Sequence, residues 1–156
     1  MTPPDPLTEL RAAVAAGGWR DALALLNART GHRFTSLYRI DRDALRTLVF
    51  FDRADPAAGP PDDIPAEASD CVYVRDAGRP FRVEDALADP RVAGHPKQRE
   101  VRAYYGAALT DAGGATVGTA CHFDTRPAGV SEEAIARLDA FAGLVREHGL
   151  PRRGRA

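Results

Sequence analysis

The sequence has almost no net charge and no long apolar run. Its 21 Lys and Arg residues nearly balance its 22 Asp and Glu residues, which gives a formal net charge of −1. Because this balance provides no long-range attraction to DNA, RNA or anionic lipid, we expect no nucleic-acid partner and no membrane partner. A transmembrane helix needs about 18 or more consecutive apolar residues, and none of the apolar runs approaches that length.

Cysteine is scarce, since Cys71 and Cys121 are the only two. The chain starts Met-Thr-Pro-Pro-Asp-Pro, without the basic start and apolar run of a signal peptide, so we expect a cytoplasmic protein. In that compartment thiols stay reduced, and we expect two free cysteines rather than a disulfide. The four histidines are scattered, and no Ser-His-Asp set or Gly-rich phosphate loop is present. The sequence therefore predicts no metal site, no cofactor and no catalytic residue.

The length and composition suit one globular domain. The chain has 156 residues, of which 44% are hydrophobic and 28% charged. We predict a single domain over residues 1–156, with its core at 19–148 and a basic tail at 149–156.

Apolar spacing of three and four residues predicts helices at both ends of the chain. Two short helices should open it, one before Gly17 and one from Trp19 towards Gly31. Ser131 is placed to cap a final helix that ends near Gly149. A further helix should begin between Asp63 and Pro65 and end at Gly78. Its inner face is predicted to carry Ala68, Cys71, Val72 and Arg75.

Alternating apolar and polar residues predict two hairpins and one short strand. The hairpins should comprise residues 34–41 with 44–52, and 103–110 with 115–124; the short strand should be 81–83. An irregular loop should follow at 85–99. Strands joined by tight turns are antiparallel, and helices with wide apolar stripes must cover one face of the sheet. The sequence thus predicts an α+β fold with the terminal helices on one face.

The last two strands indicate where a ligand could bind. We expect the bulky side of residues 115–124 to face the terminal helices, and the small side to face away from them. With the small side of residues 103–110, this would leave a recess beneath the 65–77 helix and the 85–99 loop. Alternatively, the small residues admit a closely packed helix, and His122 is a hydrogen-bonded or a solvent-facing histidine without a ligand. The candidate ligand-binding residues are Tyr104, Gly106, Ala108, Gly118, Ala120 and His122 on the sheet, with Tyr73 and His95 above them.

Three segments in the same order resemble bacterial GAF domains. They are residues 71–92 (Cys-Val-Tyr-Val-Arg-Asp-Ala-Gly-Arg-Pro-Phe onward), the tyrosine-glycine strand at 101–109, and Gly-Thr-Ala-Cys-His-Phe-Asp-Thr-Arg-Pro at 118–127, followed by Ser-Glu-Glu at 131–133. The resemblance extends over about residues 19–148. One departure is Ala108, where many relatives carry proline. The resemblance implies a GAF/PAS-like antiparallel sheet, with helices on one face and a covered pocket on the other.

The resemblance also implies a function. We expect a sensory domain that binds an unknown small molecule and passes a signal to a partner or an output domain. One alternative is an interaction module that forms homodimers through its terminal helices, using the apolar stripe of Ile135, Leu138, Ala142 and Val145. A second alternative is a free methionine-(R)-sulfoxide reductase, a GAF enzyme. We disfavour this reductase because the family's cysteine motif is absent and Cys121 should face the helices, away from Cys71.

Overall fold

Six strands form one antiparallel sheet in the order β3-β2-β1-β6-β5-β4. The structure is a computed structural model that describes residues 6–152. Half of the predicted basic tail, residues 153–156, lies outside them. The strands are β1 (Phe34–Asp41), β2 (Ala44–Asp52), β3 (Ile64–Pro65), β4 (Phe81–Val83), β5 (Ala103–Thr110) and β6 (Thr116–Asp124). Both predicted hairpins and the short strand are confirmed, with β6 starting one residue later than expected.

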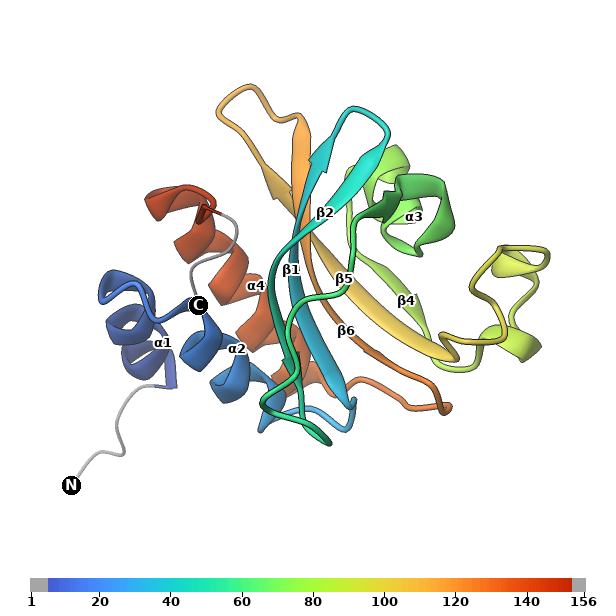
Figure 1. Cartoon of the computed structure of the whole chain (residues 1–156), viewed down its shortest axis with the longest axis horizontal. Helices are drawn as coiled ribbons and strands as arrows, with labels where there is room; N and C mark the ends of the chain where they lie inside the picture. Colours follow the sequence, from blue (N-terminus) through green and yellow to red (C-terminus); the bar gives the residue numbers. More distant parts are fainter. Residues whose placement is uncertain (1–5, 153–156) are drawn as a thin grey trace.

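The terminal helices lie on one face of this sheet, as expected (Figure 1). They are α1 (Pro6–Ala15), α2 (Trp19–Asn27) and α4 (Glu132–His148). Helices α2 and α4 pack against the strands, and α1 packs on these two helices. The main core lies between them and the sheet, where Leu23, Leu138 and Phe141 are fully buried. The Trp19 ring packs edge-on against Phe141, with ring centroids 6.2 Å apart, and so joins α2 to α4.

The terminal helix α4 begins where the sequence predicts. The Ser131 hydroxyl accepts a hydrogen bond from the Ala134 backbone N–H at 3.1 Å, which caps the first turn. The apolar stripe of α4 packs into the core of its own chain. Leu138 and Val145 are at most 2% exposed, and Ala142 is 7% exposed. The stripe proposed for dimer contacts is therefore already buried within the chain.

On the other face of the sheet, the predicted helix starts later than expected. α3 runs only over Cys71–Ala77. Ile64 and Pro65 instead form β3, which pairs with Leu45 and Ala44 at the start of β2. A single 3-10 turn follows at residues 66–68, and extended backbone at Ser69 then separates it from α3. The helix start predicted at residues 63–65 is wrong because strand pairing with β2 takes those residues.

The 84–102 segment lies beside α3 and carries two further 3-10 turns, Ala86–Ala88 and Pro90–Val92 (Figure 1). Asp85 and Asp89 each accept a backbone hydrogen bond at the start of one turn. This segment and α3 are the elements on the face opposite the terminal helices.

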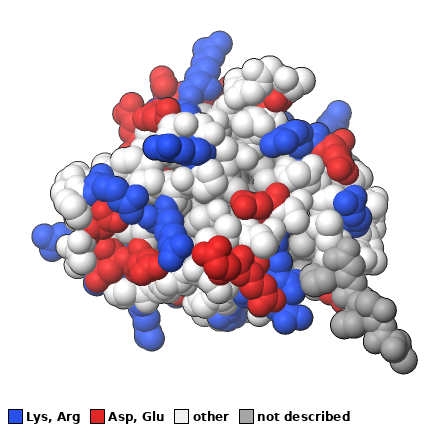
Figure 2. Space-filling model, turned by 180° about the vertical axis from the view of Figure 1, so that it is seen from behind, with Lys and Arg blue, Asp and Glu red and all other residues white. Residues whose placement is uncertain are grey.

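Charge on the surface is mixed. Lys and Arg side chains alternate with Asp and Glu side chains over the face seen in Figure 2, without an extended area of one sign. None of the helices in the described part of the chain is long and apolar enough to cross a membrane.

Candidate functional site

A cavity of about 280 Å³ opens on the sheet face that carries α3. Its wall is aromatic: Phe34 and Tyr38 come from β1, Tyr104 from β5 and Phe123 from β6. The Phe34 and Phe123 rings stack with centroids 4.9 Å apart, which gives the wall a rigid corner. The remaining lining residues are Thr47, Pro61, Asp62, Ile64, Ala68, Ser69, Asp70, Lys97, Glu100, Val101, Cys121 and Thr125.

The mouth of the cavity is polar and exposed. Pro61, Asp62, Glu100 and Thr125 are solvent-exposed at its edge. The Lys97 ammonium pairs with the Glu100 carboxylate at 3.0 Å, so its charge is partly neutralised there. An apolar wall with a few polar groups at one end is the usual form of a small-molecule site.

Asp70 is the most unusual polar group of the cavity. Its side chain is only 4% exposed. Among residues 6–152 no group donates a hydrogen bond to this carboxylate. The nearest basic side chain is His95, whose Nδ1 lies 3.6 Å from Asp70 Oδ1 and accepts a hydrogen bond from the Lys97 backbone N–H. Burial raises the pKa of Asp70 to about 6, against an opposing effect of His95. A buried carboxylate without a donor is costly, and a donor from outside the chain would relieve that cost.

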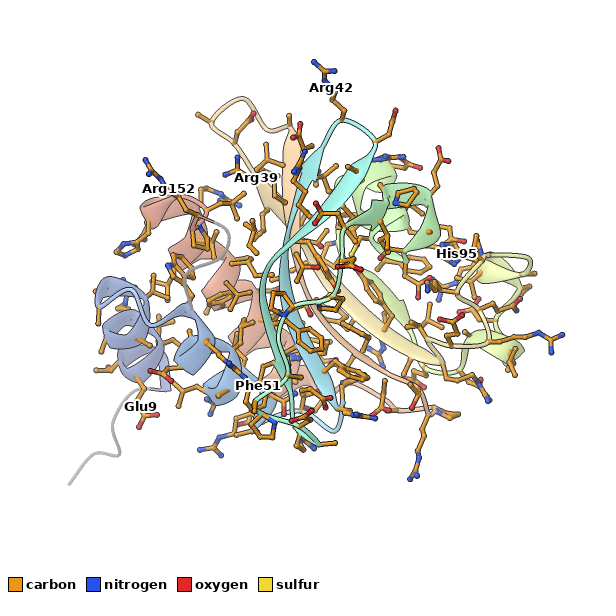
Figure 3. The ribbon with its side chains drawn as sticks, viewed as in Figure 1. Glu9, Arg39, Arg42, Phe51, His95 and Arg152 are labelled. Carbon is orange, nitrogen blue, oxygen red and sulfur yellow. The ribbon has the colours of Figure 1, made fainter. Side chains whose placement is uncertain are left out.

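His95 and Tyr73 form a second layer behind Asp70. His95 comes from the 84–102 segment and lies beside α3 (Figure 3). The Tyr73 ring, on α3, stacks on Phe81 with centroids 4.6 Å apart and contacts His95 at 5.5 Å. Neither His95 nor Tyr73 lines the cavity. Their prediction as direct ligand contacts stays untested, and the geometry gives His95 a contact with Asp70.

The prediction that Tyr104, Gly106 and Ala108 lie together on the side of β5 that faces away from the terminal helices is confirmed. Tyr104 and Ala108 pack on the α3 side, and an added Cβ at Gly106 would clash with the Tyr104 hydroxyl. The Tyr104 ring therefore lies over Gly106 and fills the space predicted there. Of these three residues, Tyr104 alone lines the cavity. Their part in ligand binding stays a prediction.

The prediction that Gly118 and Ala120 of β6 face the cavity is wrong. Ala120 belongs to the core beneath the terminal helices, and an added Cβ at Gly118 would clash with the Tyr38 carbonyl oxygen, with Leu109 of that core also close by. Thr119, Cys121 and Phe123 face the cavity side instead. The pairing register explains this, because Gly106 lies opposite Cys121 and cross-strand partners share a face. The small residues of β6 thus accommodate the packed helices, as the alternative interpretation held.

His122 likewise lies on the helix side, inside a buried polar network. The Asn27 amide donates to the Thr35 hydroxyl at 2.9 Å, and this hydroxyl in turn lies 2.7 Å from His122 Nδ1. The His32 ring stacks on His122 with centroids 5.8 Å apart. Burial lowers the pKa of His122 to about 3, with further lowering by His32 and Arg53. His122 is therefore a neutral structural group that joins α2 to the sheet.

The two cysteines meet beneath the cavity, contrary to expectation. Cys71, at the start of α3, and Cys121, on β6, belong to one buried cluster, in which Cys121 lowers the pKa of Cys71. Both are free thiols, as predicted. The expectation that Cys121 faces the helices is wrong for the same register reason. Within the described chain no group of three or more His, Cys, Asp or Glu side chains could hold a metal ion.

Sequence patterns alone missed most of the cavity wall. Phe34 and Tyr38 alternate correctly on β1, but their position over the cavity follows from pairing with Phe123 and Thr119 of β6. The only available signal was a shared aromatic face on two strands. Asp70 was missed because its burial depends on the packing of α3 against β5 and β6.

Solved structures with this architecture are known. The GAF domain of an Acinetobacter phosphoenolpyruvate-protein phosphotransferase superposes with a TM-score of 0.71 at 13% identity, covering 95% of each chain. A candidate GAF sensor protein from Burkholderia vietnamiensis gives 0.69 at 16% identity, covering 92% of this chain and 90% of that one. The chain has the fold of a GAF domain. Identities this low establish the GAF fold and leave the activity open.

The GAF fold is shared with enzymes. A free methionine-R-sulfoxide reductase from Neisseria meningitidis, solved with its substrate, superposes with a TM-score of 0.69 at 20% identity, covering 90% of this chain and 84% of that one. A cyclic di-GMP phosphodiesterase of Pseudomonas aeruginosa is 36% identical over 85 residues, which span 52% of this chain and 14% of that curated relative. No protein-family model matches the chain.

Proposed function

We propose that this GAF domain is a sensory module that binds a compact organic cation in the cavity beside Asp70. One observation carries the proposal: a carboxylate only 4% exposed lines an aromatic cavity and receives no hydrogen bond from residues 6–152. A protonated amine supplies both the missing donor and the opposite charge.

The aromatic wall suits the same class of ligand. The ring faces of Tyr38 and Tyr104 carry negative charge density, which attracts an ammonium group within about 6 Å of a ring centroid. Phe34 and Phe123 stack on each other, and the Arg33 guanidinium already lies 4.6 Å from the Phe34 centroid. The volume of about 280 Å³ is close to the lower end of the roughly 300–1,000 Å³ known for ligand pockets, which favours a small molecule.

The position of Asp70 connects such a ligand to the covering elements. Asp70 immediately precedes α3, and its partner His95 belongs to the 84–102 segment. A cation that pairs with Asp70 would favour the arrangement in which both elements close over the cavity, a population shift that a partner or an output domain can recognise. Support for an output domain comes from the phosphotransferase neighbour, whose GAF domain is one part of a larger protein, and from the short coverage of the phosphodiesterase.

The test is calorimetric titration of the purified chain at pH 7.5 with two matched pairs of probes. Benzylamine is compared with benzyl alcohol, and choline with 3,3-dimethyl-1-butanol. We expect at least one cation to bind at least tenfold more tightly than its neutral counterpart. In Asp70→Asn the preference should vanish, because a buried charge-assisted hydrogen bond contributes about 1.5–3 kcal/mol.

Asp62→Asn is the matched control, since Asp62 lies at the exposed mouth of the same cavity. It should change affinity by less than threefold at physiological salt, where exposed charges are screened. Affinity for the cation should also fall about tenfold for each pH unit below 6, because protonation of the Asp70 carboxylate competes with binding of the cation. Equal affinities for cation and neutral isostere, or an Asp62 effect as large as the Asp70 effect, would reject the proposal.

A free methionine-(R)-sulfoxide reductase is a second candidate, because Cys121 does not face the terminal helices and lies in the same cluster as Cys71. Cys71 and Cys121 belong to one buried cluster beside the cavity, and a reductase neighbour shares the fold. Turnover of free methionine-(R)-sulfoxide with dithiothreitol as reductant would support this candidate, provided that it is lost in Cys71→Ser. The sensor proposal does not require that activity.

A further inference from the structure

Two hydroxyl groups converge on the sulfur atom of Cys71. The Tyr104 hydroxyl and the Thr119 hydroxyl each donate a hydrogen bond to Cys71 Sγ at 3.1 Å. The Ser69 hydroxyl oxygen accepts a hydrogen bond from the Cys71 backbone N–H at 3.1 Å, and Cys121 belongs to the same buried cluster as Cys71. A neutral thiol is a weak acceptor, so a pair of hydroxyl donors suits a thiolate.

The two thiols differ in protonation. Burial would raise the pKa of Cys71, but the neighbouring polar groups of Cys121, Ser69, Thr119 and Tyr104 outweigh it and bring that pKa down to about 7. Burial and the neighbouring Cys71 raise the pKa of Cys121. Cys71 is therefore the nucleophile of the pair, and Cys121 keeps its proton.

The cavity supplies a route for a small oxidant. Cys121 lines it, as does Tyr104, whose hydroxyl contacts Cys71. Both sulfur atoms are otherwise shielded, since each cysteine is 0% exposed. A molecule as small as hydrogen peroxide could reach the pair through the cavity, whereas a protein thiol or a bulky disulfide could not.

We propose that Cys71 and Cys121 form a reversible redox pair that a small hydroperoxide oxidises to a disulfide between α3 and β6. The Cys71 thiolate attacks one peroxide oxygen, the O–O bond breaks, and the leaving oxygen takes a proton from water to depart as an alcohol or as water. Cys71 is left as a sulfenic acid. The Cys121 sulfur then attacks the Cys71 sulfur, the S–O bond breaks, and hydroxide leaves with the Cys121 proton as water. Two electrons pass from the thiols to the peroxide.

This pair is independent of the ligand proposal, because it needs only the cavity and the two thiols. The disulfide between Cys71 and Cys121 would link α3, which follows Asp70, to β6 beneath it. Oxidation thus acts on the same covering element that a ligand would stabilise.

The experiment exposes the reduced chain to hydrogen peroxide, unfolds it in the presence of N-ethylmaleimide and measures its intact mass. We expect the loss of two hydrogens, no alkylation of either cysteine, and full reversal by dithiothreitol. In Cys121→Ser, dimedone should trap a sulfenic acid on Cys71. In Cys71→Ser, Cys121 should stay reduced.

A conservative variant tests the role of the donors without removing a sulfur. Thr119→Val deletes one hydrogen bond to Cys71 Sγ, and should slow oxidation at pH 7 at least threefold and move the midpoint of the rate–pH profile upward. Thr119→Ser keeps the hydroxyl donor, so it should retain the oxidation rate and the rate–pH midpoint of the parent chain. Cysteines that remain alkylatable at peroxide doses that fully oxidise glutathione, disulfides only between chains, or equal oxidation of Cys121 in Cys71→Ser would each overturn the proposal.

Discussion

Replacement of His122 with asparagine should flatten the acid sensitivity of this domain. His122 is 1% exposed, and its ring is held neutral by burial, by stacked His32 and by Arg53. Its pKa is about 3 in the folded chain and 6.5 without these effects. The unfolded chain therefore takes up the proton first, so the stability is complete above pH 6.5 and is lost as the pH falls towards 3.

The magnitude follows from the two pKa values. A gap from 6.5 to about 3 corresponds to a maximum loss of about 5 kcal/mol, of which about 2 kcal/mol falls between pH 6.5 and pH 5. Other groups contribute to the total. Burial also lowers the pKa of His32, which adds to the acid loss, whereas Asp70, with its pKa raised to about 6, favours the folded chain as pH falls from 6 to 3.8.

Urea unfolding at four pH values between 5 and 7.5 measures the difference between the parent chain and His122→Asn. Asparagine offers the Thr35 hydroxyl an acceptor but has no titrating group, so the variant should be less stable at pH 7.5 and should approach the parent by about 2 kcal/mol at pH 5. His148→Asn, at the exposed end of α4, is the control and should keep the parent's slope. Parallel pH profiles for the parent and His122→Asn would refute the assignment of His122 as a buried neutral group.

Four further substitutions test the contacts described above. Gly118→Val should cost at least about 2 kcal/mol in thermal or urea unfolding, because its Cβ would clash with the Tyr38 carbonyl oxygen, while Ala108→Val should cost less than half of that; equal costs would contradict the face assignment of β6. Asn27→Ala should cost about 2–3 kcal/mol, since it removes the amide that donates to Thr35, and a change below 0.5 kcal/mol would show the network to be unimportant. Ser131→Ala should cost about 1 kcal/mol by loss of the α4 cap, and unchanged stability would argue against that cap.

The elements of the fold could be predicted because each has a local cause. Alternation gave the bounds of β1 and β2 to the residue, and the Ser131 cap fixed the start of α4. α3 was placed too early because the pairing of Ile64 and Pro65 with β2 is a long-range contact, which competes with a local helix signal.

The site could be predicted only in part, because its faces depend on the pairing register between neighbouring strands. Alternation assigns residues of one strand to two faces, but it does not state which face of a strand joins which face of its neighbour. Gly118 and Ala120 were placed over the cavity because small residues leave space, yet here that space is filled by terminal helices. Cys121 and Asp70 gained their importance only from contacts between distant segments.

The burial of the α4 stripe bears on the predicted homodimer. The α4 stripe is buried within the chain, so the predicted homodimer would need other surfaces of the terminal helices. It stays a prediction that light scattering can check.

The most direct test of the ligand proposal is a crystal structure with the best-binding cationic probe. We predict its ammonium group roughly 3 Å from the Asp70 carboxylate, among the rings of Phe34, Tyr38 and Tyr104. A probe bound elsewhere, such as the groove lined by Arg39 and Leu150 at the far end of β1, with the Asp70 cavity empty, would contradict it.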